Sequence, residues 1–203
     1  MVEVLDIIKR RRSVRFYTRE AISEDKMKKL VQAALWAPSG HRIYGRRIVI
    51  VQQEEAIGRI KAVSPGLHGN PTALMILCRD KQKEKEAAEN WVARGPEQEK
   101  LVEKAGVSFF KDTVNVLGIM DIAIAAQNIC LEATALGIGS CMIGLFDQDA
   151  ARKLLDLPEN IVPQLFVSLG YRDKLADTNY SRSVRGVPMR RSVEEMVIGW
   201  IKG

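Results

Sequence analysis

The stretch from Gly118 to Leu145 constrains the fold most, because a long apolar helical pattern ends there in a run of glycines. Its isoleucines and leucines are spread around the helix, and the main polar residues, Asp121, Asn128 and Glu132, fall on one narrow stripe. A helix of this kind is buried in the centre of a domain or in a large interface. The pattern therefore predicts a central helix that ends at Gly137, a residue type that readily adopts positive φ.

The segment after this helix, residues 139–144, is apolar and has glycine at both ends. Two interpretations are open on this evidence. The segment is either a plain turn beside the core, or a stretch of backbone that lies against a flat ligand, because glycine permits close approach.

The remaining pattern predicts helices interspersed with strands that are far apart in sequence. The β-branched run 48–51 is typical of a strand buried on both faces, and apolar runs at 74–78 and 164–170 predict two more strands. Ser23 and Asp147 are placed to cap helices, and Ser192 with Glu195 forms a capping box. We expect an α/β or α+β fold on one sheet.

At 203 residues the chain is long enough for one sizeable domain. We expect a single domain over residues 1–203, with a charged helical excursion at about 80–115 that is interrupted by Gly95 and Pro96. A lid over a site and a solvated helical hairpin are both compatible with that composition.

Composition narrows the cellular setting. Cys78, Cys130 and Cys141 are odd in number and lie in apolar runs, which favours reduced thiols in a cytoplasmic protein. The N-terminus does not resemble a signal peptide, and polar residues interrupt the most apolar run, so we expect a soluble protein without membrane contact. The net charge of +6 comes with few aromatic residues, which argues against a nucleic-acid partner.

Side chains for acid–base, nucleophilic or metal chemistry are scarce. The two histidines, His41 and His68, do not form a metal-ligand cluster, and neither a Walker loop nor a Gly-x-Ser-x-Gly elbow occurs. We therefore predict no catalytic side chain and no metal site. A redox cofactor with its own reactivity suits such a chain.

The clearest positive signal is the run Arg-Arg-Arg-Ser-Val-Arg over residues 10–15. Arginines and a hydroxyl at this spacing can bind a phosphate with bidentate geometry. The alternative is a solvated basic helix end, which the helix dipole favours.

Several motifs occur in one order along the chain: this arginine run, Ala-Pro-Ser-Gly at 37–40, the helix from Asp121 to Asn128, Leu-Gly-Ile-Gly-Ser-Cys at 136–141, and a basic pair before Ser192. Together they resemble the FMN-dependent nitroreductase family over nearly the whole chain. The resemblance implies an α+β fold with a central mixed, mainly antiparallel sheet flanked by helices. It also implies a homodimer with two FMN sites at the interface, where the central helix would pack.

The resemblance assigns cofactor-binding roles to individual residues. Arg11 and Ser13 match positions that hold the FMN phosphate and ribityl chain, and Arg15 matches the basic residue near the N1–O2 edge of the flavin ring. Gly144 and Leu145 match the place where backbone amides face flavin N5. The remaining expected contacts are Arg12, Pro38, Ser39, Gly40, Arg42, Arg190 and Arg191, with Pro38, Ser39 and Gly40 reaching the flavin of the other subunit.

One segment departs from the family. The family commonly continues its Pro-Ser-Ser with x-Asn-x-Gln-Pro-Trp, whereas this chain reads His-Arg-Ile-Tyr-Gly-Arg over residues 41–46. Arg42 stands for the asparagine, Tyr44 for the glutamine and Arg46 for the tryptophan. Either the added cations meet an anionic substrate or the phosphate, or this half of the site has changed its purpose.

The resemblance predicts an oxidoreductase in which FMN takes hydride at N5 from NADH or NADPH. The hydride then passes, in ping-pong order, to a small conjugated acceptor such as a nitroaromatic compound or a quinone. The altered 42–46 segment supports a second hypothesis, an FMN-binding sensor or carrier that does not turn over NAD(P)H.

Overall fold

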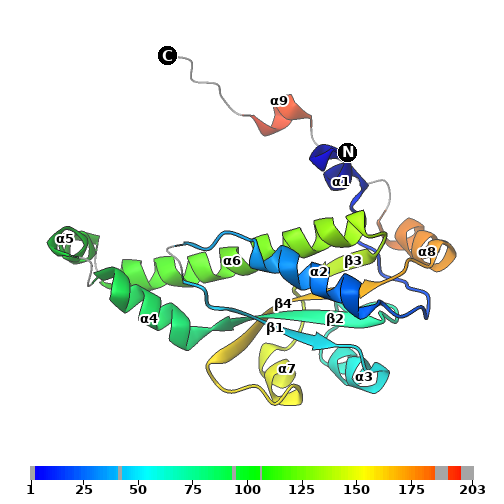
Figure 1. Ribbon diagram of the computed structural model, residues 1–203, viewed down its shortest axis with the longest axis horizontal. Helices are drawn as coiled ribbons and strands as arrows, with labels where there is room; N and C mark the ends of the chain where they lie inside the picture. Colours follow the sequence, from blue (N-terminus) through cyan, green and yellow to red (C-terminus); the bar gives the residue numbers. More distant parts are fainter. Residues whose placement is uncertain (1–2, 41–42, 93–94, 106, 186–191, 198–203) are drawn as a thin grey trace.

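The computed structural model of this chain describes residues 3–40, 43–92, 95–105, 107–185 and 192–197 (Figure 1). Its centre is a four-stranded sheet of order β1-β2-β4-β3, in which every neighbouring pair is antiparallel. The strands are β1 (Arg46–Val51), β2 (Ala73–Asp80), β3 (Gly139–Ile143) and β4 (Ile161–Gly170). The expected α+β class with a mainly antiparallel sheet is confirmed.

Helices cover both faces of this sheet (Figure 1). One face carries α2 (Glu24–Leu35) and α6 (Val107–Ala135), and the other carries α3 (Glu54–Ala62) and α7 (Gln148–Leu154). Strand β2 serves both layers, because successive side chains of a strand point to opposite faces. Met75 and Leu77 belong to the first layer, and Leu74 and Ile76 to the second.

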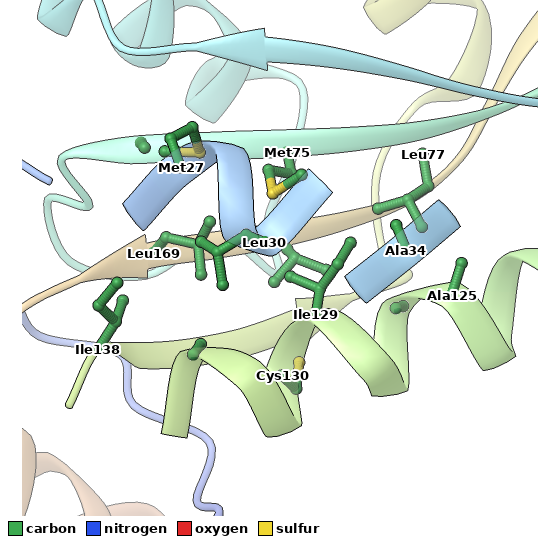
Figure 2. Packing of buried hydrophobic residues seen from close by; sticks show 14 of the residues in the cluster. Met27, Leu30, Ala34, Met75, Leu77, Ala125, Ile129, Cys130, Ile138 and Leu169 are labelled. Atoms are coloured by element: carbon green, nitrogen blue, oxygen red, sulfur yellow. The ribbon is translucent and has the colours of Figure 1, made fainter. Parts of the chain in front are cut away.

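The central helix α6 is longer than the sequence pattern indicated, since it starts at Val107. Ile122, Ala126, Ile129 and Ala133 form its buried face, at the spacing of a helix that packs along one side. Figure 2 shows Ile129 of α6 opposite Leu30 of α2 in the first layer. The small alanine side chains let α6 lie close to the layer beneath it.

By length and composition, the Thr113–Ala135 part of α6 is apolar enough to cross a membrane. The expectation that polar residues would exclude such a stretch is therefore wrong. Its buried face nevertheless packs on the sheet and on α2, which is the position of a core helix.

Two strand predictions need correction. Strand β1 is an edge strand whose Ile48 and Val49 are half-buried and whose Ile50 is exposed, so it is not buried on both faces as its β-branched run suggested. Residues 139–143 form the opposite edge strand, β3, where we expected a turn or a ligand-facing segment. Glycine lowers strand propensity, and here the pairing with β4 outweighs that preference.

The helix ends follow the predicted chemistry. Ser23 accepts a hydrogen bond from Lys26 N at 3.5 Å, and Asp147 accepts one from Ala150 N at 2.9 Å. Ser192 and Glu195 form the reciprocal capping box that starts α9 (Val193–Met196). Gly137 has φ +75° just after α6 ends.

The charged excursion is helical. It consists of α4 (Lys81–Val92), α5 (Pro96–Ala105) and the first turns of α6, and it projects beyond the end of the sheet (Figure 1). Helix α5 packs against α4 and α6.

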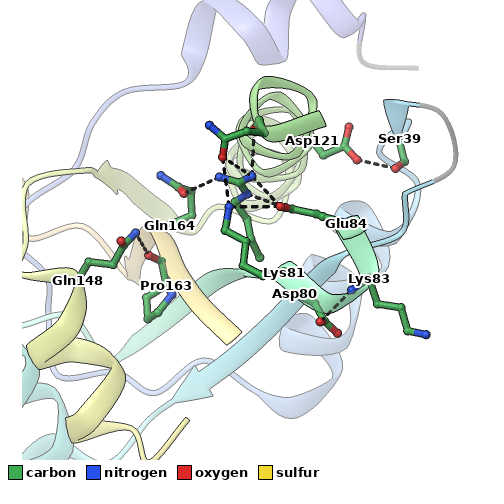
Figure 3. Close-up of polar contacts among 11 residues, drawn as sticks. Ser39, Asp80, Lys81, Lys83, Glu84, Asp121, Gln148, Pro163 and Gln164 are labelled. Carbon is green, nitrogen blue, oxygen red and sulfur yellow. Dashed lines mark hydrogen bonds and ion pairs between the residues drawn. The ribbon is translucent and has the colours of Figure 1, made fainter. Parts of the chain in front are cut away.

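A buried ion pair joins this excursion to the sheet. Arg79, on β2, donates to both carboxylate oxygens of Glu84, on α4, at 2.6 and 2.8 Å. It also donates to the backbone and side-chain oxygens of Asn115, on α6, at 3.0 and 2.9 Å. Figure 3 shows Glu84 and Lys81 converging on this point, so one guanidinium connects a strand to two helices.

Removing one partner of this pair should destabilise the protein strongly. Glu84→Gln leaves the buried Arg79 charge without compensation, so we expect the free energy of unfolding to fall by about 3–5 kcal/mol. Urea unfolding followed by circular dichroism measures this change. The control is Glu24→Gln, which breaks the exposed Glu24–Lys28 pair and should cost under about 0.5 kcal/mol. Equal losses for the two variants would show that burial of the Arg79 pair is unimportant.

Candidate functional site

The arginine segment leaves α1 (Val4–Arg10) and is tied directly to the edge of the sheet. Val14 N–H donates to the carbonyl of Ser140 at 2.9 Å, and Ser13 forms a parallel bridge with the same residue. This bridge adds a parallel contact to the antiparallel sheet. It places Ser13 beside the first residues of β3.

Two buried side chains, Asp177 and Tyr17, bind the backbone of this segment. Asp177, on α8 (Lys174–Arg185), accepts from Arg15 N–H at 2.8 Å and from Arg172 Nε at 2.8 Å. The Tyr17 hydroxyl donates to the Val14 carbonyl at 2.5 Å and lies 2.8 Å from Ser168 Oγ. Burial raises the pKa of Tyr17 far above its usual range, so the phenol keeps its proton and remains a donor.

The guanidinium groups of this segment make no ion pair within the part of the chain that the structure describes. Arg12 is exposed and donates to the carbonyls of Lys9 and Arg11. Arg15 is only 8% exposed, donates to the Ser13 carbonyl at 2.9 Å, and stands 5.9 Å from the Tyr180 ring centre. Cations without carboxylate partners suit a bound anion.

The backbone places the arginine segment beside the C-terminal end of α6. Ser13, two residues after Arg11, bridges Ser140, which follows the end of that helix at Ala135. Burial raises the pKa of Cys130, on α6, while the Ser140 hydroxyl and the Arg11 charge oppose that rise.

A short loop, residues 64–71, joins this segment to the end of β3. Gly69 has φ +64°, and a Cβ there would lie 2.0 Å from the Arg15 carbonyl oxygen, so only glycine fits. Three residues earlier, Gly66 N–H donates to the Leu145 carbonyl at 3.2 Å. The loop thus brings Arg15 and Leu145 to its two sides.

A hollow of about 500 Å³ lies against this loop and the residues after Arg15. Its polar wall includes Lys61, His68, Asn70 and Asp173. The His68 and Tyr180 rings are 5.2 Å apart, and the Phe16 and Tyr180 rings are 5.3 Å apart. An aromatic cluster therefore flanks the Arg15 guanidinium.

Gly144 and Leu145 follow β3 and are exposed. A Cβ at Gly144 would meet only Leu165 Cδ1, at 3.9 Å, so the packing of the chain itself does not require glycine here. Open backbone at this point leaves room for a flat ligand to approach closely.

Pro38, Ser39 and Gly40 lie elsewhere, against a more N-terminal part of α6. Ser39 Oγ and Gly40 N–H donate to the Asp121 carboxylate, at 2.5 and 2.9 Å (Figure 3). Asp121 is fourteen residues before the end of α6 at Ala135, or about 21 Å along its axis, and Ser13 bridges Ser140 beyond that end. Within one chain, the structure does not bring the 38–40 segment next to Ser13.

The altered segment after Gly40 is described from Ile43 onward, and there its arginines bind the chain itself. Arg46 donates to the carbonyls of Ala37 and Pro38, at 2.7 and 2.9 Å. Arg47 pairs with Asp80 at 2.9 Å. These two cations are therefore engaged in internal contacts.

Arg42, Arg190 and Arg191, which we expected at the phosphate or the flavin, lie outside the described residues. Sequence reasoning also missed Tyr17, Asp177, Gly69 and Asp121. Of these, only Asp121 carried a signal, because an acidic residue on an apolar helix predicts a buried partner. The others acquire a role only through contacts between segments distant in sequence.

These features fit an FMN phosphate and ring. Arg11, Arg12 and Ser13 offer guanidinium and hydroxyl donors side by side, and they face no competing carboxylate among the described residues. The 64–71 loop links Arg15, which lies against Gly69, to Leu145, which binds Gly66, next to the open backbone at Gly144. The set contains donors for an anion at one end and glycine-lined backbone at the other.

The Nitroreductase family model matches residues 8–171 of the chain. The chain belongs to the nitroreductase family. This family member is 30% identical, over 177 residues, to a protein of Archaeoglobus fulgidus named "Putative NADH dehydrogenase/NAD(P)H nitroreductase". That match covers 84% of this chain and 86% of the relative.

Two further matches extend the family assignment. "FMN reductase (NADPH)" of Bacillus subtilis is 22% identical over 181 residues, covering 87% of this chain and 68% of that protein. The crystal structure of a nitroreductase family protein from Streptococcus pneumoniae superposes with a TM-score of 0.73 at 19% identity, over 98% of this chain and all of that one. At that identity the structural match supports the fold alone.

The buried Tyr17 hydroxyl should be the more important of two comparable tyrosines in this nitroreductase family member. Tyr17→Phe leaves the Val14 carbonyl without its donor, so we expect a loss of about 1–3 kcal/mol in the free energy of unfolding. Tyr171→Phe is the control, because Tyr171 is half-buried and its hydroxyl accepts from Lys26 Nζ at 2.8 Å. We expect it to cost about 1 kcal/mol or less. Chemical denaturation of both variants decides the point, and a larger loss for Tyr171→Phe would contradict it.

Proposed function

We propose that the protein is an FMN-dependent oxidoreductase that passes hydride from NADH or NADPH to a small conjugated acceptor. The acceptor class includes nitroaromatic compounds and quinones, and the order is ping-pong. The observation that carries the proposal is the set of guanidinium groups at residues 11–15, which make no ion pair among the described residues. The chain belongs to the nitroreductase family and also has open glycine backbone at Gly144. The names of the relatives from Archaeoglobus and Bacillus support the same chemistry.

In this proposal the chain binds the cofactor from two ends. Arg11, Arg12 and Ser13 hold the phosphate and the ribityl chain through charge-assisted hydrogen bonds. Arg190 and Arg191, which lie outside the described residues, are proposed as the second basic contact to the phosphate, and Arg42 as a further contact. Tyr17 and Asp177 keep the arginine segment in place from behind.

FMN, when bound, supplies a ring that accepts hydride at N5 and then releases it to the acceptor. Gly144 and Leu145 present backbone to that locus, and no side chain of the chain is proposed to move a proton. Arg15, held by Asp177 through its backbone and flanked by Tyr180, places positive charge near the edge of the ring where negative charge collects. Positioned charge of this kind favours reduction.

We also propose that the protein is a homodimer through the outer face of α6. Val116, Ile119 and Met120 are exposed apolar side chains on that helix, and Met120 is 50% exposed. Trp36, at the end of α2, is 86% exposed. Exposed apolar side chains that gather on one side of a helix are typical of a protein interface. The second copy would bring its Pro38–Gly40 segment to the flavin that Arg11 and Arg15 hold.

Two broader expectations belong to the same proposal. We propose that residues 1–203 act as a single domain and that the protein works in the cytoplasm. The three cysteines are buried and form no disulfide, and burial raises the pKa of Cys78 to about 12, which suits thiols that stay reduced and unreactive.

The alternative of a flavin-binding sensor or carrier was based on the altered 42–46 segment. Arg46 and Arg47 bind the chain's own carbonyl and carboxylate groups, so their presence does not argue for a changed site. No described observation favours this alternative over the enzyme.

An absorbance spectrum tests the function. The purified protein should be yellow or bind added FMN, and anaerobic NADH or NADPH should bleach it. A colourless protein without FMN affinity would falsify the proposal, and bound flavin that is not bleached would favour the sensor or carrier.

Arg15→Ala should lower the flavin's reduction potential or its occupancy, because a positive charge near the ring is lost. Potentials measured against a reference dye, and FMN content per chain, report both effects. Arg19→Ala removes an exposed arginine four residues further on and serves as the matched control. If both variants behave like the unaltered protein, Arg15 does not belong to the site.

Met120→Asp should separate the dimer, because it places a charge in the proposed apolar interface. Light scattering should then give about the 22.7 kDa of one chain, against twice that mass for the unaltered protein. Ile50→Asp is the control, since Ile50 is 40% exposed but lies on the edge strand β1. A Met120→Asp protein that remains dimeric would place the interface elsewhere.

A further inference from the structure

Most polar groups of the segment 37–40 form hydrogen bonds within the chain. Ala37 N–H donates to Ala34 O, and the Gly40 carbonyl accepts from Ile43 N. The carbonyls of Ala37 and Pro38 accept from Arg46. Two further donors, Ser39 Oγ–H and Gly40 N–H, go to Asp121.

The side chains of Arg46 and Asp121 bind different kinds of polar group in this segment. The guanidinium of Arg46, which has only donors, takes the two carbonyls, and the carboxylate of Asp121, which has only acceptors, takes the two donors. Asp121 is 3% exposed, so its hydrogen bonds are protected from water. We call this pair the 37–40 clamp.

The clamp also fixes the residues that follow. Ser39 Oγ accepts from Tyr44 N at 3.3 Å, and Arg47 Nη1 donates to Tyr44 O at 3.2 Å. Tyr44 is held at φ +49°, a left-handed conformation that a tyrosine rarely adopts, with its side chain 63% exposed. Such a conformation persists only where the surrounding contacts impose it.

The clamp lies next to the surface proposed for the partner. Asp121 directly follows the exposed Met120 on α6, and Ala37 directly follows the exposed Trp36 on α2. Ser13, in contrast, bridges Ser140 just beyond the C-terminal end of α6, and that end is about 21 Å along the helix from Asp121. The clamp is therefore not next to Ser13 of its own chain, and the site of the second copy in the proposed dimer is the one on which we expect it to act.

Building on the proposed function, we propose that Asp121 and Arg46 are positioning residues that act across the dimer. They hold residues 37–40 in the conformation that meets the FMN of the partner subunit. In this chain Arg46, which stands where the family commonly has tryptophan, supplies half of that support.

The first test measures FMN affinity of the full-length dimer by flavin fluorescence quenching. Asp121→Asn replaces an acceptor with an amide, so Ser39 or Gly40 loses its partner. Arg46→Lys cannot reach two carbonyls with the fixed fork of a guanidinium. Each variant should weaken FMN binding about tenfold, as expected for the loss of a hydrogen bond to a charged group.

Matched controls separate positioning from general stability. Gln148→Ala removes the amide that donates to the Pro163 carbonyl, and Arg152→Lys makes the same arginine-to-lysine change at a residue that donates to the Leu157 carbonyl; both residues lie on α7, on the other face of the sheet. Both should lower the thermal midpoint while FMN affinity and the flavin's visible spectrum stay unchanged. If a control and a clamp variant lower the thermal midpoint of unfolding equally and also weaken FMN binding equally, the clamp has only a structural role.

The second test uses mixed dimers with two different affinity tags, one chain carrying Arg15→Ala and the other Asp121→Asn. If the clamp acts across the dimer, one site combines Arg15→Ala with Asp121→Asn, and the other site has an unaltered Arg15 and an unaltered clamp. The mixed dimer should then bind one FMN with the affinity of the unaltered protein. If the clamp acts within its own chain, each site carries one defect and neither binds normally, which overturns the inference.

The outcomes also distinguish the inference from the function on which it rests. An unaltered protein that binds FMN, combined with clamp variants of unchanged affinity and spectrum, overturns the inference alone. An unaltered protein without FMN affinity overturns both.

Discussion

A helix that is apolar on all sides has to be covered on all sides, and α6 imposes this requirement on the rest of the molecule. The sheet and α2 cover one face with Ile122, Ile129 and their neighbours. Val116, Ile119 and Met120, on another side of the helix, stay exposed in the single chain. One chain therefore covers only part of the helix, and a second copy is the cover that we propose for the rest.

The few polar residues of α6 are the points where other segments attach. Asn115 binds Arg79 of β2, Asp121 binds the 39–40 segment, and Asn128 donates to the carbonyl of Ala33 on α2 at 3.2 Å. Because each partner is buried or half-buried, these contacts fix where the segments lie along the helix. Ile43, Arg46, Arg79, Glu84 and Asp121 line one narrow seam, so the excursion and the 37–40 clamp share a boundary.

The sequence predicts best those features that depend on local chemistry. The capping residues, the end of α6 at Gly137 and the buried strand β2 follow from side-chain type and period. It predicts position in the sheet poorly, because edge or centre depends on neighbours distant in sequence. Ile50 at the edge and Leu74 in the centre are both apolar strand residues, and their burial differs completely.

The same division holds for the site. The arginine run and the open glycine at residue 144 could be identified from residue type and from the family resemblance. Tyr17, Asp177 and Gly69 could not, since a phenol, a carboxylate and a glycine gain their roles only when folding brings them to Val14 and Arg15. Supporting contacts are therefore the part of the site for which the fold is needed.

The exchange at residue 46 limits how segments can be transferred between family members. Arg46 supplies donors to two carbonyls, and a tryptophan has a single N–H, so grafting the family's usual run into this chain would leave at least one carbonyl without its partner. The loop and its supporting side chains on β1 and α6 therefore form one structural unit. A chimera that receives the 37–40 sequence without Arg46 and Asp121 would have the same residues but would not keep their conformation.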